Sequence, residues 1–160
     1  MFIWHCLIVL LVSMVPLIEL RGAIPIGVGL GLPEVLVFVL AIIGNMLPVP
    51  LIYLFGRKFL EWGAARKWKV LKKFCSWCLR KGEKAGKKLL SKAGAGVYVA
   101  LFLFVGIPIP GTGAWTGTLA ASMLDLGLKK TTAAVVCGVL TAGIIMLVLS
   151  LGVFKVALGG

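Results

Sequence analysis

Residues 107–117 read Ile-Pro-Ile-Pro-Gly-Thr-Gly-Ala-Trp-Thr-Gly, and this run decides the fold because it breaks a long apolar stretch near its middle. That stretch, residues 93–124, holds 32 residues without a charged side chain. A continuous helix of that length would measure about 48 Å, against about 30 Å for the apolar core of a membrane. Proline and glycine also interrupt helices. The sequence therefore predicts two short helical arms, 93–106 and 114–126, joined by a non-helical turn at membrane depth.

The composition of the 160-residue chain is that of a membrane protein. Apolar residues make up 61% of it and the mean hydropathy is +1.11, more than a soluble domain of this size can bury. Residues 35–56 and 131–154 contain 22 and 24 residues without charge, and each fits one membrane-spanning helix. This excludes a cytosolic enzyme and an ordinary nucleic-acid-binding protein, despite the net charge of +12.

The N-terminal part follows the same plan as the C-terminal part. An apolar arm, 1–18, leads to a broken centre at Glu19-Leu20-Arg21-Gly22, and a short second arm, 23–32, precedes the span. We expect the N-terminus to be retained membrane structure rather than a signal peptide, because it lacks a basic leader region. The predicted fold is an all-α integral membrane domain, 1–160, with two inverted repeats. Each repeat is a re-entrant helical hairpin plus a spanning helix, in residues 1–56 and 93–160.

The segment between the repeats, residues 57–92, is strongly basic. It holds thirteen Lys and Arg against two acids, a net charge of +11. On a helical wheel, residues 57–80 form one amphipathic helix, which we expect Gly82 to end. The apolar side contains Leu60, Ala64, Trp68, Leu71, Phe74, Cys75, Cys78 and Leu79, and the basic side contains Lys58, Arg66, Lys69, Lys72, Lys73 and Arg80, with Lys67 out of place. Such a helix anchors a protein on anionic lipid or gathers an anionic, lipid-linked substrate.

The distribution of basic residues predicts the topology. Cytoplasmic loops are enriched in Lys and Arg, so residues 57–92 should face the cytoplasm. Lys129 and Lys130 reach the same side if 93–128 is a hairpin that enters and leaves there. Both termini are then external, and the protein is a multi-pass protein of the inner (plasma) membrane. The alternative is a plain four-helix membrane protein, which leaves these two lysines outside.

The candidate substrate- or ion-binding residues lie at the two broken centres. A charge at membrane depth is costly and usually has a partner or a function, which points to Glu19 and Arg21. They could bind substrate or ion, pair to fix the loop, or touch water if the hairpin is shallow. We expect them to approach the second centre near the midplane, with Asn45 beside them as a hydrogen-bonding group. The remaining candidates are Gly111, Thr112, Gly113, Trp115 and Thr116, where the amides that open the second arm can hold an anionic headgroup.

Metal or redox chemistry is not expected. Cys75 and Cys78 form a C-x-x-C pair without a second pair or a nearby histidine, and a structural zinc site needs four ligands. The chain has only one His and five acids, so we predict no cofactor, no metal and no enzyme activity.

Three motifs together resemble the signature of the putative small multidrug export protein family of bacteria and archaea. They are residues 16–25, Gly44-Asn45-x-x-Pro48-x-Pro50, and Pro108-x-Pro110-Gly111-Thr112-Gly113-Ala114-Trp115-Thr116-Gly117. The resemblance covers nearly the whole chain and implies efflux. More distantly the plan resembles the DedA/VTT superfamily, whose paired re-entrant hairpins move lipids.

These observations predict a small secondary transporter for an amphiphilic, anionic or lipid-linked substrate, coupled to protons or sodium ions through Glu19 and Arg21. The alternatives are an uncoupled lipid scramblase or DedA-type flippase, and a membrane accessory protein that transports nothing. The expected partners are membrane lipids and a second copy of the chain, because four membrane elements shield two polar hairpin turns poorly. No nucleic-acid partner is expected.

Overall fold

The structure of this protein is a computed structural model, and it describes residues 1–65, 69–93, 96–109 and 111–157. It is built from helices. In chain order they are α1 (Phe2–Met14), α2 (Glu19–Gly29), α3 (Glu34–Met46), α4 (Val49–Leu51), the π-helix η1 (Ile52–Gly56), α5 (Arg57–Ala65), α6 (Lys69–Ala93), α7 (Val97–Gly106), α8 (Ala114–Met123) and α9 (Leu128–Ala157). The described residues contain no strand, in agreement with the all-α prediction.

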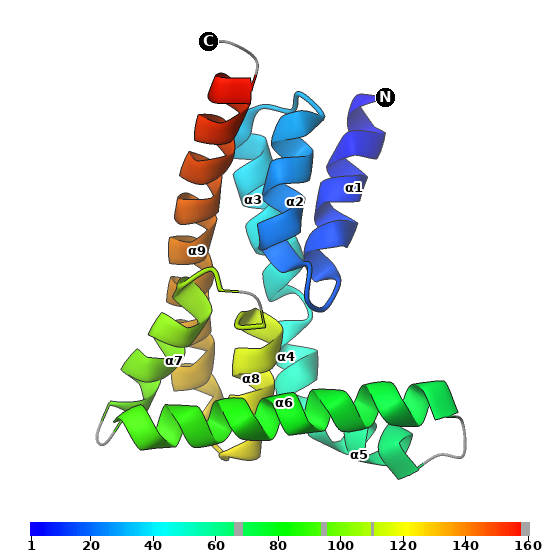
Figure 1. The fold of residues 1–160 in the computed structure, drawn as a ribbon, viewed down its shortest axis with the longest axis vertical. Coiled ribbons are helices and arrows are strands. Elements are labelled where there is room, and N and C mark those ends of the chain that lie inside the picture. The colour runs from blue at the N-terminus through cyan, green and yellow to red at the C-terminus, as the bar shows by residue number, and fades with distance from the viewer. Residues whose placement is uncertain (66–68, 94–95, 110, 158–160) are drawn as a thin grey trace.

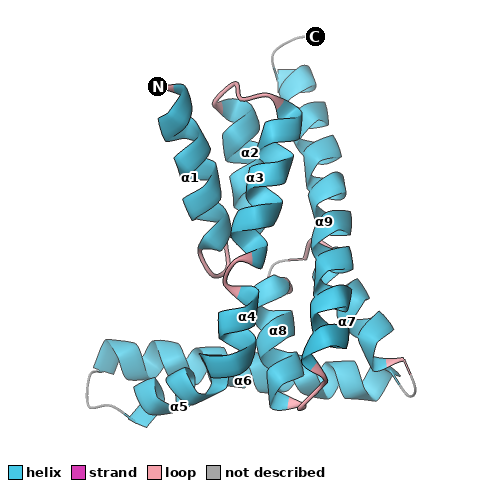
Figure 2. Ribbon diagram, turned by 180° about the vertical axis from the view of Figure 1, so that it is seen from behind, coloured by secondary structure: helices cyan, strands magenta, loops and turns pink. Residues whose placement is uncertain are grey.

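Two short hairpins approach the centre of the molecule from opposite ends (Figure 1). The α1–α2 hairpin comes from the end where α1 begins and α9 ends, and the α7–α8 hairpin comes from the end crossed by α6. Each is followed by a longer path through the bundle, α3 to η1 in the first half and α9 in the second. The same arrangement is visible from behind (Figure 2).

Within the described residues, two paths are long and apolar enough to cross a membrane. One runs from Glu34 to Gly56 and the other is α9. The first is interrupted at Pro48 and Pro50: α3 ends at Met46, and the chain continues as the one-turn α4 and then η1. Both prolines lie in the first turn of the restarted helix, where a missing N–H costs little. Unlike the predicted span 131–154, α9 already begins at Leu128, directly after Gly127.

Glycines let the helices of each half approach closely. In the first half, a Cβ on Gly27 of α2 would lie 2.6 Å from Val37 of α3. In the second half, a Cβ on Gly117 of α8 would lie 2.7 Å from Val105 of α7, and one on Gly138 of α9 would lie 2.7 Å from the same valine. Small residues at helix contacts are the usual means of packing in membranes, where burial adds little driving force.

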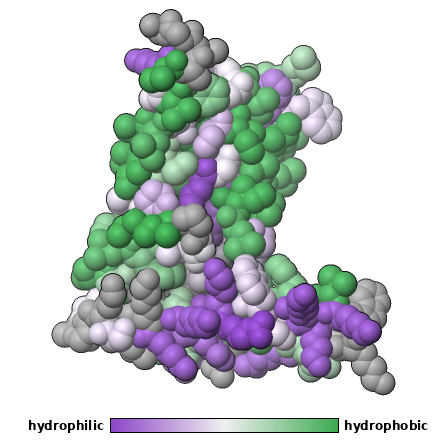
Figure 3. Space-filling view, in the orientation of Figure 1, coloured by the Kyte–Doolittle hydropathy of each residue, from purple (hydrophilic) through white to green (hydrophobic). Residues whose placement is uncertain are grey.

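The surface has an apolar body and a hydrophilic end (Figure 3). Large apolar side chains such as Val35, Ile144 and Val153 are exposed on α3 and α9. The basic side chains gather on α5 and α6, and the predicted polar-side residues Lys58, Lys69, Lys72, Lys73 and Arg80 are exposed. An exposed apolar surface of this extent is suited to contact with lipid tails rather than water.

The basic segment differs from the single amphipathic helix expected. It forms two helices, α5 and α6, that pack against each other, while Arg66, Lys67 and Trp68 lie outside the described residues. Gly82 does not end a helix, because α6 continues to Ala93. A Cβ on Gly82 would lie 3.0 Å from Leu119 and Met123, so this glycine lets α6 cross closely over α8. The apolar side of α6 therefore packs partly on protein, and Cys75 is fully buried.

Replacing Gly138 by alanine should destabilise the protein by about 1–3 kcal/mol, because the new methyl group would overlap Val105 and come within 3.0 Å of the Phe102 carbonyl oxygen. The thermal unfolding midpoint in mild detergent measures this. Gly152→Ala in the same helix is the matched control. Nothing lies within 4 Å of its Cβ, and the gain in helix propensity should leave stability equal or higher. Equal midpoints for the two variants would contradict the packing.

Candidate functional site

The turn of the first hairpin is short and strained. Helix α1 ends at Met14, two residues before Pro16, and α2 begins at Glu19. Leu17 and Glu19 adopt positive φ angles of 78° and 52°, which are uncommon for residues with a side chain. The broken centre is thus shorter than expected. Glu19 and Arg21 lie in the first turn of α2 rather than in unwound chain, because the amide of Glu19 already donates to the Val15 carbonyl at 3.0 Å.

The turn of the second hairpin is held together by Thr112. Its hydroxyl Oγ1 lies 3.1 Å from the Ile107 carbonyl oxygen and 2.8 Å from that of Ile109, within hydrogen-bonding distance of both. Gly111 and Gly113 have φ angles of 86° and 151°, where a side chain would be strained, and α8 begins directly afterwards. Pro110, which belongs to the predicted centre, lies outside the described residues.

The carboxylate of Glu19 caps the start of α8. It accepts hydrogen bonds from the backbone N–H groups of Ala114, at 3.3 Å, and Trp115, at 3.0 Å. Glu19 is 4% exposed, so these are buried contacts. A Cβ on Gly113 would overlap the carboxylate, which explains the glycine at this position. A negative group at a helix N-terminus satisfies unpaired amides and complements the positive end of the helix dipole.

Arg21 contacts the other side of the same turn. Its guanidinium donates to the carbonyl oxygens of Ile109 and of Ile107, the latter at 3.2 Å, and to Oγ1 of Thr112 at 3.0 Å. The two carbonyls follow the end of α7, where the helix dipole is negative. The charges of the first hairpin therefore match both helix ends of the second: the acid lies at the start of α8 and the base at the end of α7. Each charge is directed at backbone groups across the interface.

Asn45 is fully buried but does not form the expected hydrogen bond to a hairpin turn. Neither its amide nitrogen nor its carbonyl oxygen has a partner among the residues that the structure describes. Helices α2 and α3 are antiparallel (Figure 1), and Gly27 of α2 lies against Val37 of α3. Glu19 is eight residues before Gly27 and Asn45 is eight residues after Val37, about 12 Å along each helix, so Glu19 and Asn45 lie at the same level. Asn45 forms no bond to the described part of either hairpin turn because its side chain lies on the buried face of α3, between helices.

The remaining candidates lie on the far side of the second turn. Trp115 and Thr116 line an apolar cavity between the first hairpin turn and α6, and the indole Nε1 of Trp115 is buried without a partner in the described structure. Gly111 lies beside the ammonium group of Lys81. The structure thus gathers Glu19, Arg21, Gly111, Thr112, Gly113, Trp115 and Thr116 around one turn.

Contacts of Lys81 and Tyr53 with the second hairpin were not predicted from the sequence. Lys81 was one of thirteen basic residues in its segment, and nothing in the sequence distinguished it. Tyr53 of η1 donates to the Leu126 carbonyl, and its own carbonyl accepts a bond of 2.8 Å from Ser122 of α8. These bonds fasten the end of the first span to the second hairpin.

Removing either charge should destabilise the protein. Glu19→Ala leaves two buried N–H groups without an acceptor, so we expect a loss of about 2 kcal/mol or more. Arg21→Ala removes three hydrogen bonds across the interface, but its carbonyl partners keep donors within the turn, so we expect a smaller loss, about 1 kcal/mol. Because both side chains hold one turn, the double variant should lose less than the sum of the single losses. Unfolding midpoints in mild detergent measure this, with Lys155→Ala, an exposed cation at the end of α9, as the control. Losses that add fully would show that the two contacts are independent.

Comparison with known proteins identifies the family. The family model described as "Putative small multi-drug export protein" matches residues 19–145, from Glu19 at the start of α2 into α9. The match includes both charges of the first hairpin, the whole second hairpin turn, the first apolar span and the first part of the second. No curated protein and no solved structure matches the chain. The protein is therefore a helical membrane protein that belongs to the putative small multi-drug export protein family.

Proposed function

We propose that this protein is a small secondary transporter that moves amphiphilic, anionic or lipid-linked molecules across a membrane. One observation carries the proposal: the carboxylate of Glu19 accepts hydrogen bonds from the backbone amides at the start of α8. Amides at a helix start are also suited to bind an anionic headgroup. Glu19 and such a headgroup would compete for the same N–H groups. Binding of substrate is then linked to the charge of Glu19.

The architecture supports a pair of inverted repeats with re-entrant hairpins. α1, α2, α7 and α8 contain 13, 11, 10 and 10 residues, about 15–20 Å each, and are too short to cross an apolar core of about 30 Å. The two halves run in opposite directions (Figure 1). Broken helices that meet at a repeat interface are the usual binding site of secondary transporters.

The coupling follows from the contacts of the two charges. An ionised Glu19 holds the amides of Ala114 and Trp115 and keeps the hairpin turns together. A proton, or a sodium ion on the carboxylate, weakens this attraction and frees the amides for an anionic headgroup, with Arg21 as a second contact. Loss of the cation returns Glu19 to the amides and expels the headgroup. The anion and the coupling cation therefore move together.

The basic segment sets the orientation that we propose. Residues 57–92 face the cytoplasm of a cell membrane and both termini face outward. α6 crosses the end of the bundle opposite the start of α1 and the end of α9, as this orientation requires (Figure 1). We further propose that two copies associate through their exposed apolar faces.

Flux assays in liposomes test the coupling. The purified protein should move a fluorescent anionic amphiphile faster with an imposed proton or sodium gradient than without it. Glu19→Gln, which cannot exchange a proton, should transport independently of either gradient, and Arg21→Ala should raise the concentration needed for half-maximal flux. Glu34→Gln, at an exposed acid at the start of α3, should behave like the native protein.

Three results would contradict this function. Normal transport by both site variants at every pH would make the pair purely structural. Gradient-independent flux in the native protein would indicate an uncoupled scramblase. Flux restricted to cationic amphiphiles would make Glu19 the binding group.

Cysteine labelling in intact cells tests the orientation. In a variant without native thiols, a cysteine at position 2 should react with a membrane-impermeant maleimide from outside. A cysteine at position 84, in the basic segment, should react only after the cells are opened. The reverse pattern would discard the proposed topology.

A further inference from the structure

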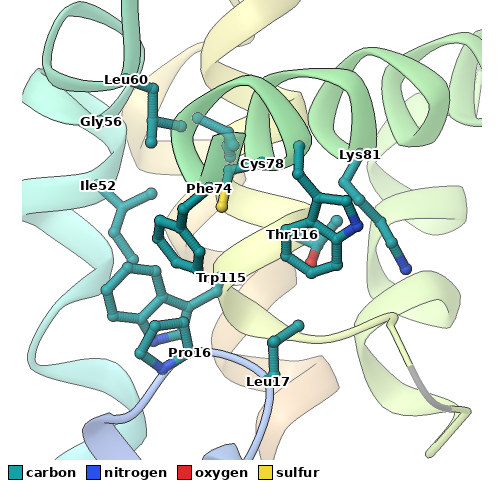
Figure 4. A pocket seen from close by; sticks show the side chains of 12 residues that line it. Pro16, Leu17, Ile52, Gly56, Leu60, Phe74, Cys78, Lys81, Trp115 and Thr116 are labelled. Carbon is teal, nitrogen blue, oxygen red and sulfur yellow. The ribbon is translucent and has the colours of Figure 1, made fainter. Parts of the chain in front are cut away.

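A cavity of about 250 Å³ lies beside the contact between the hairpin turns, and the mechanism above does not use it (Figure 4). The first hairpin turn contributes Pro16 and Leu17, η1 contributes Ile52, and α8 contributes Trp115. Helix α6 closes the remaining side. The cavity is therefore built from both halves and from the basic segment.

Its lining is almost entirely apolar. Phe74 and Trp77 of α6 and Trp115 of α8 supply aromatic surface, and Leu17 and Ile52 supply aliphatic surface. Burial, and then the neighbouring Cys75, raises the pKa of the Cys78 thiol, so this lining group stays neutral. Transfer of apolar groups from water to an apolar pocket is favourable, so this lining is suited to an alkyl chain.

One cation stands at the border of the cavity. Lys81 is the only charged residue among the described residues that line it. Its ammonium group lies 5.3 Å from the ring centroid of Trp77 and is close enough to the second turn that a Cβ on Gly111 would lie 2.7 Å from it. The side chain thus leads from the apolar space toward the contact of Glu19 and Arg21.

We propose that this cavity binds the alkyl chain of an anionic amphiphile, with the headgroup held by the ammonium group of Lys81. The site would load the transporter proposed above, and it rests on that function for its role but not for binding itself. A cationic amphiphile fits poorly, because Lys81 repels it and already occupies the face of Trp77. From Lys81, a headgroup would reach the amides of α8 by a short movement past Gly111.

Tryptophan quenching by a brominated fatty acid tests the site. Trp77 and Trp115 line the cavity, so they report on it once Trp4, Trp62 and Trp68 are replaced by phenylalanine. In the purified full chain, without any gradient, dibromostearate should quench them saturably. Lys81→Met should weaken this binding about tenfold while leaving the binding of the neutral methyl ester unchanged. Lys81→Arg should restore it.

The matched control is Lys84→Met, an exposed lysine on the same helix that does not line the cavity. This variant should bind dibromostearate as tightly as the native protein does. A second variant, Cys78→Phe, fills the cavity and should abolish quenching by acid and ester alike, with circular dichroism to confirm folding.

The outcomes separate this site from the transport function. Equal weakening by Lys81→Met and Lys84→Met, or equal affinity for the acid, the ester and a trimethylammonium amphiphile, would overturn the site. Saturable, Lys81-dependent binding without flux would confirm the site and overturn the transport function. Flux without saturable quenching would overturn the site and leave the transport function standing.

Discussion

The structure depends on the hydrogen bonds that backbone N–H and carbonyl groups of the second hairpin turn form with the first hairpin. Away from water, each unpaired N–H or carbonyl group costs free energy, so a broken helix pair at membrane depth needs partners from the protein. Glu19 supplies an acceptor for the first amides of α8, and Arg21 supplies donors for the carbonyls after α7. Both come from the first turn of α2. The two halves of the chain are joined by charges that complement helix ends.

This constraint explains the residues around the turn. Gly113 has no side chain because the carboxylate occupies that space, and Leu17 and Glu19 hold strained backbone angles that direct the carboxylate across the interface. Asn45, buried at the same level, keeps a free donor and a free acceptor among the described residues. Strain and unpaired polar groups are uncommon in a structure optimised only for stability. Some of them lie here, where the proposed transport would require the turns to separate and rejoin.

The basic segment connects this contact to the surface. α6 crosses over α8 at Gly82, and the same helix carries the aromatic residues and the lysine that border the apolar cavity. Amphipathic character alone predicted a helix lying on lipid. The structure shows that part of the apolar side of α6 packs on α8, because Leu119 and Met123 in the C-terminal half of α8 lie against Gly82 of α6. A segment suited to anionic lipid is thus packed directly against the proposed site.

The sequence by itself determined the membrane class, the places where the helices break and the charged residues of the candidate site. These follow from local rules: uncharged windows of membrane length, proline and glycine that stop helices, and charges too costly to be incidental. Only the tertiary structure decided what those residues touch. That Glu19 meets Ala114 and Trp115, that Arg21 meets Ile107 and Thr112, and that Lys81 borders a cavity depend on contacts between segments tens of residues apart. The prediction that Gly82 ends a helix is wrong for the same reason. In a sequence, a glycine that ends a helix looks the same as one that lets another helix cross closely, until the crossing helix is known.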